Sequence, residues 1–245
     1  LTIAVLAAVG RSWSGNNAGV AAALLCATSP PMVAYSREGR PYALACLISA
    51  MLLWAAADPS RRHRSTLVAL AVVGPAVQYT LGVVILAILA IRWRDGHRPV
   101  AALMGLALSC AALSSGLVTQ LGRRGSDLVD GHLSVHGHDL LWAPGAFTGF
   151  LVHGTGRWPA VGLVMLMVAA ALVASRQPDK RLIVAALAPP LTLWALSAAY
   201  AHPFGAFRQT LVVVPGMLLL FAVARPRLSA LLSAVLAVAT LARGP

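Results

Sequence analysis

Apolar runs separated by short polar or charged stretches follow one another along the chain. A helix needs about 20 mostly apolar residues to cross a bilayer. Runs approaching that length occupy residues 1–10, 18–33, 42–57, 100–119, 158–175, 182–200, 210–224 and 228–242, the first of them as the tail of a truncated helix. The pattern therefore predicts an all-α fold, a polytopic transmembrane helical bundle with about eight full spans.

The mostly apolar stretch at residues 66–91 is not predicted to form a single span, because arginine clusters flank it on both sides. A single helix would place these clusters on opposite sides of the membrane, against the positive-inside tendency. We therefore predict two short helices, residues 66–77 and 81–91, that turn at Gln78-Tyr79-Thr80 and insert only in part.

Proline and polar residues set the other predicted boundaries. We expect a polar turn at residues 11–17 and a break in the following helix near Pro30-Pro31, since proline lacks the N–H that a helix needs. Residues 140–152 fit an amphipathic segment at the membrane interface. No repeat and no domain boundary is visible, so residues 1–245 are expected to form one membrane domain.

Composition supports a membrane protein and narrows its partners. The chain is 59% hydrophobic and 11% charged, whereas soluble domains have about 25% charged residues. Its formal charge of +12 is spread over small clusters between apolar runs. Without interleaved aromatic residues these clusters do not form a nucleic-acid groove, and they favour membrane lipids with anionic headgroups. Cys26, Cys46 and Cys110 are expected to be small core hydrophobes.

The distribution of Lys and Arg gives an orientation. Twelve of these residues fall in the loops assigned to the cytoplasm and seven fall on the other side. Three polar stretches then share the outer face, around residues 36–42, 120–142 and 200–209. The prediction is a multi-pass protein of the cell membrane whose active face is extracytoplasmic.

The charged heptapeptide SREGRPY at residues 36–42 lies between two apolar runs and holds Glu38, the one glutamate of the chain. A charge at membrane depth costs about 3 kcal/mol, so such residues are functional by default. Glu38 and Arg40 could also form a local ion pair that only orders the loop.

The segment ATSPPMVAYSREGRPYAL at residues 27–44 resembles the SP…YSxEaRxYaL segment of GT-C fold glycosyltransferases, which are related to protein O-mannosyltransferases and the lipid A aminoarabinose transferase. Two further stretches resemble the same family in the same order. They are Gln78-Tyr79-Thr80, at the place of a His-Tyr pair, and HPFGAFR at residues 202–208, at the place of a loop that ends in Arg-Tyr. Gln78 and Gln209 depart from the family pattern.

The resemblance implies a GT-C-like enzyme that moves a sugar, with mannose as one candidate, from a polyprenyl-phosphate carrier to a lipid, glycan or protein acceptor. No cofactor is implied. Arg40 and Arg208 would stabilise the leaving lipid phosphate, because a guanidinium matches phosphate oxygens. Tyr42 and Tyr79 would bind sugar or phosphate, and Glu38 would orient Arg40 or hold a substrate group. The catalytic carboxylate of the family lies upstream of Leu1, in a first outer loop, so residues 1–245 alone are expected to be inactive.

Other interpretations stay open. Arg208 could be an interfacial arginine, and Tyr42, Tyr79 and Tyr200 could belong to an aromatic belt. The ligands His132, His136, His138 and Asp139 offer an alternative divalent-metal site, although Gly131 and Gly137 favour a loop without one. Instead of an enzyme, the chain could be a transporter or flippase for a lipid-linked substrate, or a non-catalytic membrane subunit.

Overall fold

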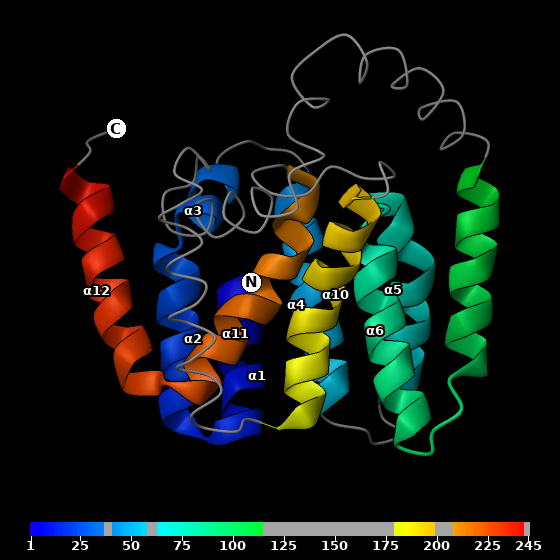
Figure 1. Ribbon diagram of the computed structural model, residues 1–245, viewed down its shortest axis with the longest axis horizontal. Helices are drawn as coiled ribbons and strands as arrows, with labels where there is room; N and C mark the ends of the chain where they lie inside the picture. The colour runs from blue at the N-terminus through cyan, green and yellow to red at the C-terminus, as the bar shows by residue number, and fades with distance from the viewer. Residues whose placement is uncertain (37–40, 58–62, 115–178, 199–207, 243–245) are drawn as a thin grey trace, which may run out of the picture.

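The computed structural model describes residues 1–36, 41–57, 63–114, 179–198 and 208–242, and every regular element in these residues is helical (Figure 1). This confirms the predicted all-α class. The helices are α1 (Thr2–Ser14), α2 (Asn16–Thr28), α3 (Pro30–Ser36), α4 (Tyr42–Ala57), α5 (Arg64–Val77), α6 (Leu81–Arg94), an apolar helix at Val100–Ser114, α10 (Lys180–Ala198), the 3-10 helix η2 (Arg208–Val213), α11 (Val214–Ala224) and α12 (Pro226–Ala242).

Most turns between the described helices lie at one of two opposite ends of the bundle, whereas the N-terminus lies between these ends (Figure 1). We call one of them the motif end; Ser36, Tyr42, Tyr79, Ala198 and Arg208 lie there. The other is called the basic end. It holds the last turns of α1, α4, α6 and α11, together with the first turns of α2, α5, α10, α12 and the helix at Val100–Ser114.

Helix α4 is at the centre of the packing. It contacts α1, α5, α6, α10 and α11, as well as η2. Its residues are apolar on all sides, which is typical of a helix with neighbours all round, and Ile48, Leu52 and Leu53 are buried. The predicted bounds of this helix, residues 42–57, are confirmed.

Glycine allows α1 and α2 to pack closely. A Cβ atom on Gly10 would lie 2.8 Å from the carbonyl oxygen of Ala18 and 3.0 Å from Cα of Gly19. The two helices are joined by Gly15 alone, at φ 80°, a conformation that favours glycine. The predicted polar turn at residues 11–17 is therefore wrong in extent. Arg11 to Ser14 continue α1, where a basic residue in the last turn suits the helix dipole.

The two predicted helix breaks are confirmed. The chain bends by 58° between α2 and α3, at Ser29 before Pro30-Pro31. Helices α5 and α6 form the predicted hairpin, and backbone N–H groups of Leu81, Gly82 and Val83 bond to the carbonyls of Gln78, Tyr79 and Thr80 at 2.9, 3.0 and 3.2 Å.

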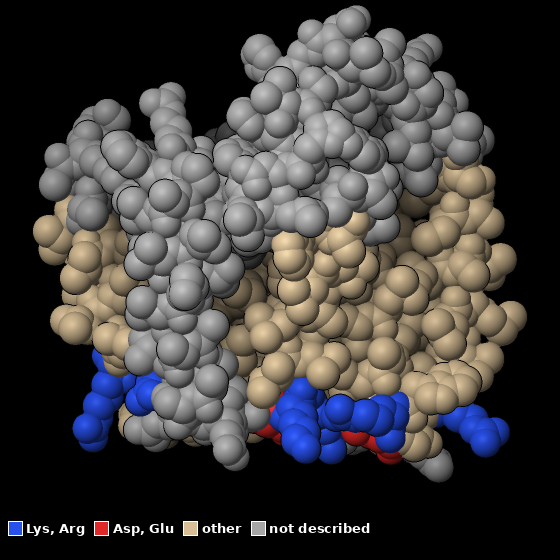
Figure 2. Space-filling model, in the orientation of Figure 1, with Lys and Arg blue, Asp and Glu red and all other residues tan. Residues whose placement is uncertain are grey.

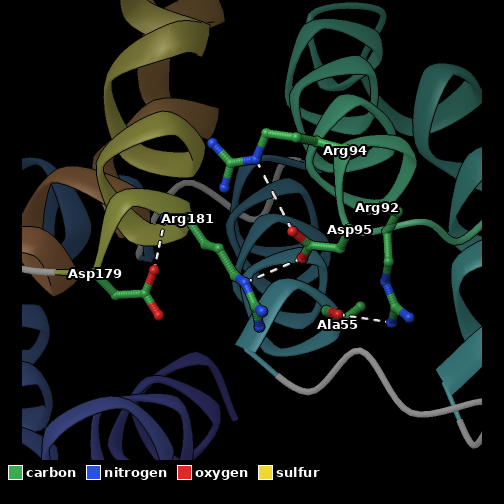
Figure 3. A network of polar contacts seen from close by, with 6 residues as sticks. All are labelled: Ala55, Arg92, Arg94, Asp95, Asp179 and Arg181. Carbon is green, nitrogen blue, oxygen red and sulfur yellow. Dashed lines mark hydrogen bonds and ion pairs between the residues drawn. The ribbon is translucent and has the colours of Figure 1, made fainter.

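At the basic end a buried arginine ties α6 to α4. The side chain of Arg92 is 5% exposed, and its Nη2 donates a 2.7 Å hydrogen bond to the carbonyl of Ala55 in the last turn of α4 (Figure 3). Carbonyls of that turn have no intrahelical N–H donor, and they carry the partial negative charge of the helix C-terminus. A guanidinium supplies both a donor and a positive charge. Arg92 thus caps α4, where the sequence suggested only a loop charge.

On the face shown in Figure 2, the Lys and Arg side chains of the described residues lie along the edge at the basic end. Within the described residues no single helix has both the length and the apolar composition to cross a membrane, and α2 with α3 meet this requirement only as a bent pair. The number of membrane spans stays a prediction from the sequence.

Candidate functional site

The described parts of the two longer motifs lie at the same end of the bundle. Tyr42, the last residue of the charged heptapeptide, begins α4, and the backbone of Arg208 begins η2. Glu38 and Arg40 lie outside the described residues. Tyr79 lies in the α5–α6 turn at the motif end and its side chain is 39% exposed.

Two side-chain hydrogen bonds hold η2 against α4. The hydroxyl of Ser49 donates to the carbonyl of Val212 at 2.6 Å, and the thiol of Cys46 donates to the carbonyl of Leu211 at 3.7 Å. Ser49, Cys46, Leu211 and Val212 are all buried. We call this pair of bonds the α4–η2 latch.

The latch fixes the level at which the two motifs begin. Cys46 lies one α-helical turn after Tyr42, and Leu211 lies one 3-10 turn after Arg208. Both helices run from the motif end towards the basic end (Figure 1). The start of α4 and the start of η2 are therefore brought to a similar depth in the bundle, although 166 residues separate Tyr42 from Arg208.

Pro215 explains why one of these carbonyls is available. In a continuous α-helix the carbonyl of Leu211 would accept the N–H of residue 215, but proline has none. Pro215 instead occupies the first turn of α11, where a missing N–H costs nothing. The preceding residues wind as the 3-10 helix η2, and the Leu211 carbonyl turns to Cys46.

A cavity of about 250 Å³ lies beside the latch at the motif end. Its lining comes from α1, the α2–α3 bend, the start of α4, and η2, and includes Ile3, Met32, Tyr35, Ser36, Cys46 and Leu211. Apolar walls with a few hydroxyl groups are found in small-molecule sites, although this cavity is smaller than the usual minimum of about 300 Å³ for such sites. The charged heptapeptide connects two of its walls, since Ser36 and Ala43 both line it.

Tyr35 and Tyr42 flank the undescribed part of the heptapeptide and pack edge to face, with ring centroids 5.4 Å apart and planes at 70°. This contact holds α3 against the first turn of α4. The N-terminus of α4 carries the positive end of its dipole and has no acidic residue in its first turn. The electrostatic field there favours an anion.

The alternative metal site cannot be placed, because His132, His136, His138 and Asp139 lie outside the described residues. Within the residues that are described, no group of three His, Cys, Asp or Glu side chains could hold a metal ion.

The sequence analysis missed the residues that join the two motifs. Ser49 is a lone serine in an apolar helix, and Cys46 was assigned only a packing role. A buried hydroxyl needs a hydrogen-bond partner, so a serine in this apolar helix weakly indicates a polar contact. Its partner is the backbone carbonyl of Val212, and because every residue has such a group the sequence does not identify it.

Replacing Ser49 by alanine is expected to lower the free energy of unfolding by about 1–2 kcal/mol, since it leaves a buried carbonyl without this donor. The matched control is Ser233→Ala. Ser233 is equally buried but bonds within its own helix, to the carbonyl of Ser229 at 2.8 Å. This control is expected to change stability by less than about 0.5 kcal/mol. Denaturant unfolding in detergent, followed by circular dichroism, measures both; equal losses would show that the latch contributes nothing of its own.

Comparisons of the chain with family models, with curated proteins and with solved structures each return no match.

Proposed function

We propose that the protein is a membrane glycosyltransferase that moves a sugar from a polyprenyl-phosphate carrier to an acceptor on the extracytoplasmic face. The α4–η2 latch is the observation that carries the proposal, because it holds the helix that follows Arg40 and the helix that begins with Arg208 at one end of the bundle. The guanidinium groups of Arg40 and Arg208, from distant parts of the chain, then bind the same lipid phosphate.

The middle part of the bundle, between the motif end and the basic end, supports placement in a membrane. Between its two ends the described helices carry no Asp, Glu, Lys or Arg beyond their terminal turns. Large apolar side chains point outwards there; Leu86, Met104, Leu108, Leu191 and Leu231 are 52–68% exposed. An exposed apolar belt of this kind suits contact with lipid or with other chains rather than with water.

The cavity suits the part of the donor next to its phosphate. In the reaction the bond between the sugar carbon and the phosphate oxygen breaks, and the acceptor oxygen bonds to that carbon as a base removes its proton. Polyprenyl phosphate leaves with an added negative charge. Arg40 and Arg208 stabilise this charge, Glu38 orients Arg40, and Tyr42 and Tyr79 donate hydrogen bonds to sugar or phosphate.

The test is a transfer assay with the protein expressed from its whole gene and reconstituted in liposomes. Polyprenyl-phosphate-linked mannose, glucose and aminoarabinose are offered as donors with a membrane extract as acceptor. The expected result is release of free polyprenyl phosphate and labelled acceptor with one of these donors. Movement of an intact donor between leaflets, without release of polyprenyl phosphate, would instead identify a flippase and overturn the proposal.

A further inference from the structure

The basic end has far more cations than carboxylates. Nine Lys and Arg residues of the described chain lie there, against two carboxylates, Asp95 and Asp179. The basic residues are Arg11, Arg64, Arg92, Arg94, Arg98, Lys180, Arg181, Arg225 and Arg227.

Both carboxylates already have partners (Figure 3). Oδ2 of Asp95 lies 3.0 Å from Nε of Arg181, as an ion pair without hydrogen-bond geometry. Oδ1 of Asp95 lies 3.9 Å from Nε of Arg94. Asp179 accepts the backbone N–H of Arg181 at 2.8 Å and so caps α10. Arg181 and Arg92 are thereby committed to internal contacts. The exposed cations of the described basic end are Arg11, Arg64, Arg94, Arg98, Lys180 and Arg227.

Four of these exposed cations form one arc. Arg94 ends α6, Lys180 begins α10, and Arg227 is the second residue of α12. Helix α10 contacts both α6 and α11, and α11 contacts α12. The side chain of Arg94 is 52% exposed, and Lys180 and Arg227 are exposed. Figure 2 shows Lys and Arg side chains along this edge. We call Arg94, Arg98, Lys180 and Arg227, with Trp93 between Arg92 and Arg94, the headgroup arc.

Apolar faces begin directly beside the arc. The helix after Arg98 exposes Val100, Met104 and Leu108 at 48%, 60% and 68%, and α12 after Arg227 exposes Leu231 and Val235 at 61% and 57%. Trp93 is 56% exposed between these two environments, as tryptophans at a membrane interface are. An anionic phospholipid matches both parts, with a phosphate for the cations and acyl chains for the adjoining faces. A nucleic acid offers phosphates but nothing to cover Met104 or Leu231.

We propose that the headgroup arc binds anionic phospholipid headgroups and anchors the basic end in an anionic leaflet. Like the proposed function, this lipid binding requires that the protein lie in a membrane, but it does not depend on sugar transfer. Binding of the basic end to an anionic leaflet orients the bundle, so that the motif end lies at the opposite leaflet.

The experiment titrates purified protein in neutral detergent with phosphatidylglycerol or phosphatidylcholine and follows the thermal unfolding midpoint. Phosphatidylglycerol is expected to raise the midpoint and phosphatidylcholine is not, and the effect weakens with salt. The triple variant Arg94→Gln, Lys180→Gln, Arg227→Gln is expected to lose about 100-fold in apparent affinity for phosphatidylglycerol, from three lost charges. The charge-conserving triple Arg94→Lys, Lys180→Arg, Arg227→Lys keeps it.

Each other outcome contradicts the inference. Equal effects of the two lipids, or an unchanged glutamine triple, would show that the arc does not select anionic headgroups. A midpoint shift of the same size with inorganic phosphate would indicate a free-anion site. Tighter binding of a single-stranded oligonucleotide would indicate a nucleic-acid surface. Arg208→Gln separates the two proposals, since it is expected to lower sugar transfer while binding phosphatidylglycerol as the wild type does.

Discussion

Replacing Arg208 by glutamine is expected to lower the rate of sugar transfer about 100-fold, the usual loss when one preorganised donor to a developing negative charge is removed. The latch supports this expectation, because it holds the start of η2 beside the start of α4. Arg208→Lys should recover only part of the rate, since an ammonium keeps the charge but not the planar fork that matches a phosphate.

The control for this variant is Arg64→Gln, which removes the same charge at the basic end and is expected to leave the transfer rate within about two-fold, as for an exposed surface residue. Arg40→Gln should resemble Arg208→Gln, and Glu38→Gln should lose less if it acts through Arg40. Wild-type rates in Glu38→Gln, Arg40→Gln and Arg208→Gln together would overturn the assignment of the donor site.

Gly10→Ala is expected to lower the free energy of unfolding by about 2–3 kcal/mol, the upper part of the usual range for overpacking. The three atoms nearest to the new Cβ would be backbone atoms of Ala18 and Gly19, at 2.8–3.0 Å. Backbone cannot rotate away as a side chain can, so α1 and α2 would have to separate. Their separation would also disturb the cavity, to which both helices contribute lining residues such as Ile3 and Cys26.

Gly82→Ala is the matched control for Gly10→Ala. Gly82 lies in the first turn of α6, and a Cβ there would meet nothing within 4 Å. Alanine favours a helix over glycine by about 0.8–1.0 kcal/mol, so this variant should be neutral or more stable. Chemical unfolding of both variants in one detergent gives the comparison. Similar stabilities for the two variants would show that the contact at Gly10 is not tight.

Local signals in the sequence predicted much of the helical architecture. Pro30-Pro31 marked the α2–α3 bend, the polar triplet Gln78-Tyr79-Thr80 marked the α5–α6 turn, and charges on both sides of residues 42–57 set the bounds of α4. Each of these features depends on a few neighbouring residues, such as a missing N–H or a change from apolar to polar side chains.

Features that depend on partners elsewhere in the chain were missed. Arg92 was assigned to a cytoplasmic loop, yet it is buried because the carbonyl of Ala55 offers it an acceptor. The 3-10 start at Arg208 follows from Pro215 together with Ser49 and Cys46. The sequence shows each of these residues but not which of them meet. The shared end of the motifs was predicted from loop charges, whereas the latch and the cavity required the packed structure.

A photoreactive polyprenyl-phosphate analogue gives the most direct test of a donor site at the motif end. Mass spectrometry of the labelled protein is expected to find the adduct on α3 and on η2, whose residues Met32, Tyr35, Ser36 and Leu211 line the cavity. Excess unlabelled polyprenyl phosphate should prevent this labelling. Adducts confined to the helix ends of the basic end, or adducts that unlabelled carrier does not reduce, would contradict a donor site between the two motifs.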